Sequence, residues 1–232
     1  NLDLLSIGLA YGDTGYVRPS AILAWVAQPA TDWFWQFISG VNVKHSDCDG
    51  NGIVNGDDTA AIVQNYGLTH PRLLPPAPTA SPLDPSLYFT LSLDTTASGT
   101  SVQIPLGLGT QAVPATDIYG IAFTVNYEKS LVDSGSVKID FSNCWLGKLD
   151  SNIIAIQKDI YSNGKIEAAI VGIDHINKSG FGTIGVLSID MKDDISGRDY
   201  IYKLLNLNFS DVHLIRNDEI ELPLTIINDS IV

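Results

Sequence analysis

The chain has 232 residues, 45% of them hydrophobic and 17% charged, which is typical of one large or two modest globular domains. Its formal net charge of −13 at pH 7 argues against nucleic acid and against anionic membrane surfaces as partners. No stretch approaches the roughly 20 consecutive apolar residues of a membrane span, so no membrane insertion is expected.

Residues 1–12 are predicted to form a short helix with an apolar face. Within this segment, residues 3–12 align without gaps on residues 58–67, at an offset of 55 residues, and the aspartate, isoleucine, tyrosine and glycine of the two segments coincide. Such a match indicates an internal repeat. Asp3 therefore corresponds to Asp58, and the positions that would precede Asp3 in the repeat fall before Asn1.

Residues 13–46 form an insertion between the two repeats that is rich in Trp, Gly and Pro. It contains three of the four tryptophans, Trp25, Trp33 and Trp35. We favour a role for them as a small core for this segment, because a loop without regular structure has few other ways to fold. The alternative is a platform on which carbohydrate rings stack.

Residues 47–58 carry oxygen donors at the spacing of a calcium-binding loop. Position six is Gly52, where the chain turns sharply and a side chain would clash. The remaining positions offer carboxylate, amide or backbone carbonyl oxygens to Ca²⁺ at positions one, three, five, seven, nine and twelve: Asp47, Asp49, Asn51, Ile53 through its carbonyl, Asn55 and Asp58. The rival interpretation is a solvated Asp/Asn/Gly turn that binds no ion.

Residues next to the loop add no soft ligand to it. Cys48 falls at position two and is expected to point away from the ion, while His45 and His70 are expected to be structural. Because Cys48 and Cys144 are too few for a disulfide scaffold, two unpaired thiols are favoured over a bridge between domains. A helix is predicted from Gly56 to about Tyr66.

The pattern D-x-D-x-N-G-x-x-N-x-x-D, followed by a helix with Ile62 and Tyr66-Gly67, resembles the loop–helix (F-hand) repeat of dockerin modules. The resemblance implies a calcium-binding module over residues 1–70, with Asp3 as the last ligand of a first, incomplete loop. The spacing of 55 residues exceeds that of ordinary dockerins. Residues 71–86 hold six of the eleven prolines and are predicted to be a semi-rigid linker.

From Leu87 onwards apolar residues recur with period two, which indicates strands and a β-sandwich over residues 87–232. About nine strands are expected, with no helix between them, at residues 87–93, 102–108, 119–125, 137–141, 153–157, 166–171, 184–191, 204–209 and 220–227. The segments V-x-I-P-L (102–106), DIYGIAFTVNY (117–127) and G-x-G-x-I-G-V-L-S-I (180–189) resemble a cohesin. The fold class is therefore mainly β, a dockerin-like calcium module followed by a cohesin-like jelly-roll β-sandwich.

No enzyme is expected from the motifs. Asp174, His175 and Ser179 offer the three groups of a nucleophilic triad, but without a G-x-S-x-G elbow. The sequence also lacks HExxH, CxxC and a glycine-rich phosphate loop. The acidic pairs Asp57-Asp58 and Asp193-Asp194 are adjacent in sequence, whereas glycoside chemistry needs carboxylates that converge across a cleft.

The two resemblances imply a non-catalytic, calcium-binding structural protein of the extracellular space or cell surface. We predict a protomer of a head-to-tail fibre, in which the C-terminal run ELPLTIINDSIV (221–232) lies against the N-terminal repeat of the next protomer. The alternatives are a cohesin/dockerin-type adaptor in a multi-protein complex and a carbohydrate-binding or adhesive module. Other cell-surface proteins and glycans are thus further candidate partners, and the sequons at Asn177, Asn208 and Asn228 are candidate glycosylation sites.

Overall fold

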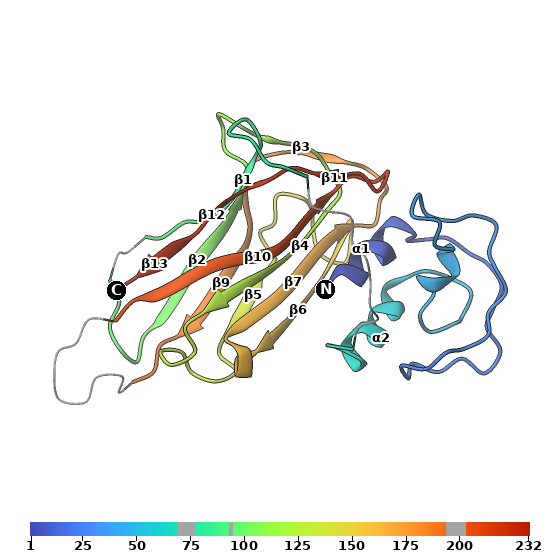
Figure 1. The fold of residues 1–232 in the computed structure, drawn as a ribbon, viewed down its shortest axis with the longest axis horizontal. Coiled ribbons are helices and arrows are strands. Elements are labelled where there is room, and N and C mark those ends of the chain that lie inside the picture. Colours follow the sequence, from blue (N-terminus) through green and yellow to red (C-terminus); the bar gives the residue numbers. More distant parts are fainter. Residues whose placement is uncertain (69–77, 93–94, 194–202) are drawn as a thin grey trace.

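A computed structural model describes residues 1–68, 78–92, 95–193 and 203–232 (Figure 1). In the N-terminal region it contains two short helices, α1 (Leu2–Leu9) and α2 (Thr59–Gln64), and two 3-10 turns, Val43–His45 and Gly56–Asp58. A third 3-10 turn, Tyr161–Asn163, lies within the sandwich. The strands are β1 (Ser86–Phe89), β2 (Ser101–Leu108), β3 (Ala115–Ile118), β4 (Gly120–Tyr127), β5 (Lys138–Asp140), β6 (Ile153–Ile160), β7 (Lys165–Gly172), β8 (Lys178–Gly180), β9 (Gly182–Asp190), β10 (Leu205–Ile215), β11 (Glu221–Leu222), β12 (Thr225–Ile227) and β13 (Asp229–Ile231).

These strands build two facing sheets, as the period-two pattern predicts. One sheet has the order β12-β1-β2-β9-β5, and the other has the order β11-β10-β4-β7-β6 with β13 also paired to β10. A small third sheet joins β3 and β8 at one end. Neighbouring strands run antiparallel except for β1 and β12, which pair in parallel. The predicted strand over 220–227 is divided into β11 and β12 around Pro223, which has no N–H to donate to a ladder.

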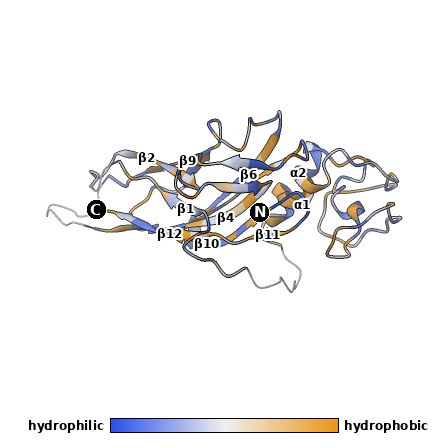
Figure 2. Cartoon of the chain, turned by 90° about the horizontal axis from the view of Figure 1, so that it is seen from above, coloured by the Kyte–Doolittle hydropathy of each residue, from blue (hydrophilic) through white to orange (hydrophobic). Residues whose placement is uncertain are grey.

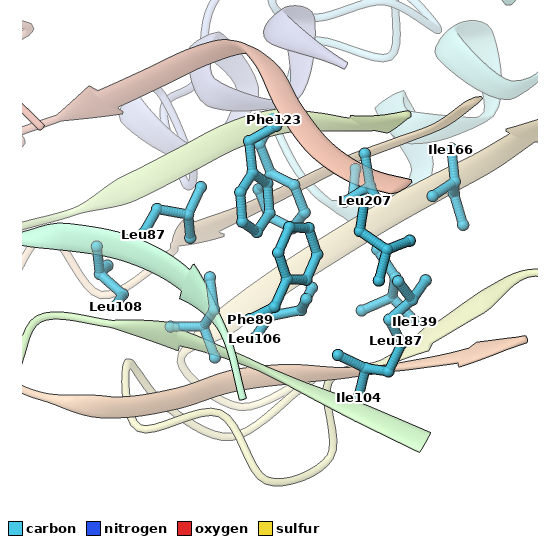
Figure 3. Packing of buried hydrophobic residues seen from close by; sticks show 14 of the residues in the cluster. Leu87, Phe89, Ile104, Leu106, Leu108, Phe123, Ile139, Ile166, Leu187 and Leu207 are labelled. Carbon is cyan, nitrogen blue, oxygen red and sulfur yellow. The ribbon is translucent and has the colours of Figure 1, made fainter. Parts of the chain in front are cut away.

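The core lies between the two sheets (Figure 3). Phe209 of β10 stacks on Phe89 of β1, with ring centroids 4.1 Å apart, and meets Phe123 of β4 edge to face at 5.9 Å. Along β10, Leu205, Leu207 and Phe209 are buried while the residues between them are exposed. This alternation shows that one face of the strand packs on the core and the other meets solvent.

The strands β4 and β7 depart from alternation, because almost every residue in them is buried. Their inner faces pack in the sandwich core, and their outer faces lie under helix α1. Leu4, Leu5 and Ile7 of α1 form a second hydrophobic cluster with Ala169 and Val171 of β7. Figure 2 shows α1, largely hydrophobic, between the sandwich and the rest of the N-terminal region.

The N-terminal region and the sandwich thus share a hydrophobic cluster. The division into a module over 1–70, a linker over 71–86 and a sandwich over 87–232 stays a prediction. Much of the predicted linker, residues 71–77, lies outside the described residues, as do His70 and Leu93.

The C-terminal run has its strand partners within the same chain. Residues of β13 pair with β10, β11 also pairs with β10, and β12 pairs with β1. Ile231 is only 2% exposed and belongs to the sandwich core. The run thus completes the sandwich of its own chain, while β12 remains an edge strand with Ile226 and Ile227 exposed. A contact of this run with a neighbouring protomer stays a prediction.

Candidate metal centre

Three carboxylates converge at the predicted calcium loop. Asp47, Asp49 and Asp58 each place an oxygen within 4.8 Å of the others. Asp47 is 3% exposed and Asp58 is fully buried. Charges of one sign that are buried together are unfavourable unless an ion or another partner compensates them. The arrangement therefore fits a cation.

The first half of the loop is shaped by side-chain oxygens that accept backbone N–H groups. Asp47 Oδ2 accepts from Gly52 at 3.1 Å, Asp49 Oδ1 accepts from Asn51 at 2.9 Å, and Asn51 Oδ1 accepts from Ile53 at 2.8 Å. Gly52 has φ +87°, in the left-handed region that favours glycine, as the loop pattern predicts. These bonds hold the donors at positions one, three and five on one tight turn.

Asp58 closes the loop from its other end. Its Oδ1 accepts the N–H groups of Cys48 and Asp49, at 2.5 and 3.1 Å, and its Oδ2 accepts the N–H of Asn55 at 2.8 Å. Asn55 in turn accepts the N–H of Asp57 at 2.7 Å and begins the 3-10 turn that leads into α2. The last predicted ligand is thus also the residue that joins the two ends of the loop.

The electrostatic environment of Asp47 also favours a bound cation. Burial raises the pKa of Asp47 to about 6, and the nearby charges of Asp58 and Asp49 contribute to that rise, although the hydrogen bond from Gly52 opposes it. Burial also raises the pKa of Asp58. Within the described residues, Asp47 Oδ1 is buried without a hydrogen-bond partner. A hard divalent cation would supply that partner and favour the ionised carboxylates.

The other predicted ligands differ in how directly the structure places them. Asn51 and Asn55 use their amide oxygens as acceptors within the loop, and each such oxygen retains a second lone pair. Ile53 is half exposed, and the ligand predicted from it is its backbone carbonyl. Asp3 is exposed on α1 and lies outside the carboxylate cluster. Its role as a ligand stays a prediction.

A short backbone segment, residues 12–15 (the strap), pairs with the loop at the junction of the first repeat and the insertion, a feature that sequence reasoning missed. Gly12 and Val54 bond at 2.8 Å, Gly15 and Gly52 at 3.0 Å, and Thr14 and Ile53 form an antiparallel bridge. Arg18 adds a bond from its guanidinium to the carbonyl of Cys48 at 2.8 Å. The signal in the sequence is the position of this segment, directly after the repeated Tyr-Gly, but nothing in its composition indicates a strand.

The tryptophans, cysteines and His45 lie in different environments. Trp33 is buried and its indole N–H reaches the carbonyl of Tyr16, whereas Trp25 and Trp35 are partly exposed. Cys48 and Cys144 are unpaired, as favoured, and burial is the main cause that raises the pKa of each thiol. His45 is exposed.

The three groups of the considered triad each bond to a different partner. Asp174 forms an ion pair with Lys178 at 2.7 Å, and the Ser179 hydroxyl accepts the N–H of Asp117 at 3.0 Å. The ring of His175 lies 2.8 Å from the carbonyl oxygen of Tyr11. Within residues 1–68, 78–92, 95–193 and 203–232, no helix has both the length and the apolar character needed to cross a membrane.

Comparison with protein-family models and with curated proteins gives no match. Solved structures do match. A type II cohesin domain from the cellulosome of Acetivibrio cellulolyticus shares 12% identity at a TM-score of 0.51, over 64% of this chain and 95% of that one. A chain of the Coh-OlpC–Doc435 complex, a type I cohesin–dockerin complex of Clostridium thermocellum, shares 14% at 0.52, over 69% and 97%. The second type II cohesin module of the adaptor scaffoldin ScaA of A. cellulolyticus shares 11% at 0.51, over 64% and 96%.

These likenesses confirm the cohesin-like part of the predicted fold. Almost the whole of each cohesin structure is matched, so the shared unit is a complete β-sandwich. At identities of 11–14% the likeness concerns the fold alone. The protein is therefore a cohesin-like β-sandwich that carries a loop with converging carboxylates.

Proposed function

We propose that this protein is a non-catalytic adaptor module of an extracellular multi-protein complex, whose cohesin-like sandwich binds a partner protein. The observation that carries the proposal is the match to cohesin structures at TM-scores above 0.5 over 95–97% of their length. One of these structures is a module of a cellulosomal adaptor scaffoldin, and another is a cohesin–dockerin complex. The partner proposed by this likeness is a dockerin module on another protein.

The fibre was predicted from two segments, the C-terminal run and the N-terminal repeat. The positions of both segments favour the adaptor function over the fibre. The C-terminal strands pair with β1 and β10, and α1 packs on β7 of the same chain. Most of both segments is thus engaged within one molecule, which leaves only the edge strand β12 to meet a neighbour. The carbohydrate-binding alternative is weakened because Trp33 is buried and the rings of Trp35 and Phe37 meet edge to face rather than side by side.

Calcium is proposed as the structural ion of the N-terminal region. Asp47, Asp49 and Asp58 would hold it, together with oxygens of Asn51, Ile53 and Asn55. Such hard oxygen donors on a flexible loop suit Ca²⁺, which takes about 6–8 of them. The ion would compensate the buried charges of the loop and so favour its folded form.

The adaptor proposal is tested by binding the intact chain to purified dockerin modules in calcium. Each dockerin is first checked against its known cohesin, so that an inactive ligand is not counted. Saturable one-to-one binding by calorimetry to at least one dockerin, lost when the calcium ligands of that dockerin are changed from Asp to Asn, is the expected result. Absence of binding across a broad panel of active dockerins would overturn the proposal. Light scattering on the chain alone distinguishes the fibre, which would grow with protein concentration.

A further inference from the structure

The outer face of β4, β6 and β7 is an apolar surface that a helix covers. Its buried side chains include Tyr119, Ala122, Ile154, Ala169 and Val171, and the residues of α1 that pack on them are fully or nearly fully buried. Tyr119 also donates a hydrogen bond of 3.0 Å to the carbonyl of Gly8. This face is therefore a helix-binding surface, and α1 is its occupant within the same chain.

The contact between α1 and β7 is close because residue 8 is a glycine. A Cβ there would overlap the side chain of Val171 and lie 2.8 Å from the carbonyl oxygen of Gly172. A helix of eight residues is marginal when isolated in water, so α1 depends on this packing. The segment therefore forms a helix only when it is docked on the sheet.

The calcium loop is connected to this docked helix by several direct contacts. Val54, at position eight of the loop, is fully buried in the same cluster as Leu4, Ile7 and Val171. The strap that follows α1 bonds to the loop at Gly12–Val54 and Gly15–Gly52, and the Ser46 hydroxyl reaches the carbonyl of Ser6 at 3.3 Å. These contacts are the route by which a change in loop structure would reach the helix.

We infer that calcium acts as a latch for this surface: the ion bound at Asp47, Asp49 and Asp58 keeps α1 docked, and its removal uncovers the outer face of β4, β6 and β7. This inference rests on the calcium site proposed above. The physical cause is the charge of the loop. Without the ion, three carboxylates repel one another in a largely buried site, and a more open loop relieves that repulsion at the cost of the contacts of Val54 and the strap.

Hydrogen exchange on the intact chain measures the latch directly. In calcium, the amides of α1 are expected to exchange slowly. In a chelator, they are expected to exchange at least about tenfold faster, because an undocked helix of this length does not persist. Strand β2 does not belong to the shared cluster and serves as the internal reference that should not change. Equal protection of α1 in both conditions, with calcium shown to bind, would overturn the latch.

Linkage gives a second, independent measurement. If calcium favours docking by a given factor, then the chain with α1 undocked must bind calcium more weakly by that same factor. Gly8→Ala introduces the clash with Val171 outside the carboxylate cluster, and we expect calorimetry to show an affinity for Ca²⁺ reduced by about tenfold, within the range typical of such couplings. Gln64→Ala is the control, since Gln64 is exposed on α2, outside both the calcium loop and the docked helix.

The outcomes separate the latch from the site on which it rests. No uptake of calcium by the wild-type chain, even at millimolar ion, would overturn the calcium site itself. Uptake with the same affinity in Gly8→Ala and in the wild type would overturn the latch and leave the site standing. Near-ultraviolet circular dichroism of Gly8→Ala verifies that the sandwich is folded, and the exchange experiment on the wild type decides the question if it is not.

Discussion

Tyr66 donates its hydroxyl hydrogen to Glu167 across 2.8 Å and thereby ties the chain after α2 to the outer face of β7. The two residues are separated by 101 positions in sequence. Glu167 also forms an ion pair with Lys165, and its side chain is only 17% exposed. This bond anchors the far end of the calcium-loop region to the sandwich, while α1 anchors the near end.

Replacing Tyr66 with Phe removes one hydrogen bond to a carboxylate and leaves the ring in place. We expect the free energy of unfolding to fall by about 1.5–3 kcal/mol, the usual contribution of a bond to a charged group. Urea denaturation followed by fluorescence measures the change. Tyr16→Phe is the control, because Tyr16 is 51% exposed and should change stability by less than about 0.5 kcal/mol. Equal effects of the two substitutions would contradict the role given to Tyr66.

The same carboxylate predicts a pH dependence of stability. Burial alone would raise the pKa of Glu167, but hydrogen bonds from Lys165 and Tyr66 and the charge of Lys165 together hold that pKa below its ordinary value. A carboxyl group whose pKa is lowered by folding stabilises the folded state above the pKa it has when unfolded. That stabilisation is lost as the pH falls through the folded pKa.

We therefore expect Glu167→Gln to be less stable than the wild type at pH 7, and the difference to shrink as the pH falls below about 4.3, the ordinary pKa of a glutamate. Thermal unfolding across pH 3–7 measures this convergence. Asp133→Asn, which removes the same charge from an exposed position, gives the background slope. A difference between Glu167→Gln and wild type that is constant over the whole range would contradict the assignment.

The sandwich could be predicted from the sequence because long strands such as β10 alternate residues that face the core with residues that face solvent. Leu205, Leu207 and Phe209 alternate with polar residues, so the pattern reveals both the strand and its buried face. The strands β3 and β8 were missed because they are three or four residues long and Asp117 within β3 has φ +58°. Such short irregular pairs carry too few residues to show a period.

The candidate metal centre could be predicted from local spacing. Its donors lie within twelve consecutive residues, and their spacing alone specifies the turn. What the sequence could not predict is the packing of α1 on β7. The apolar residues of α1 indicate that it is buried but not against what. The clue was present in the sheet, where Ala168 to Gly172 of β7 is an unbroken apolar run, as expected of a strand covered on both faces.

A substitution in the C-terminal strands tests whether they stabilise their own chain or a contact between protomers. Ile231 is 2% exposed in the core, so Ile231→Ala should lower the free energy of unfolding by about 2–4 kcal/mol. Ile227→Ala, a matched control at 53% exposure, should cost less than about 0.5 kcal/mol. Denaturation in guanidinium measures both. If Ile231→Ala instead left stability unchanged and altered only the sedimentation of an assembly, the strand would belong between protomers.

The ligands of the loop can be tested by replacing two nearby aspartates, Asp49 and Asp57, with alanine. Asp49 converges with Asp47 and Asp58, whereas Asp57 lies at position eleven, where the loop pattern has no ligand. We expect Asp49→Ala to weaken calcium binding by at least about tenfold, because it removes one charged oxygen donor from the ion. Asp57→Ala should change the affinity by no more than about threefold, through the loss of a nearby charge alone. Calorimetric titration with Ca²⁺ measures both. Comparable losses in the two variants would indicate a diffuse acidic surface instead of a coordinated ion, and would return the loop to the solvated Asp/Asn/Gly turn.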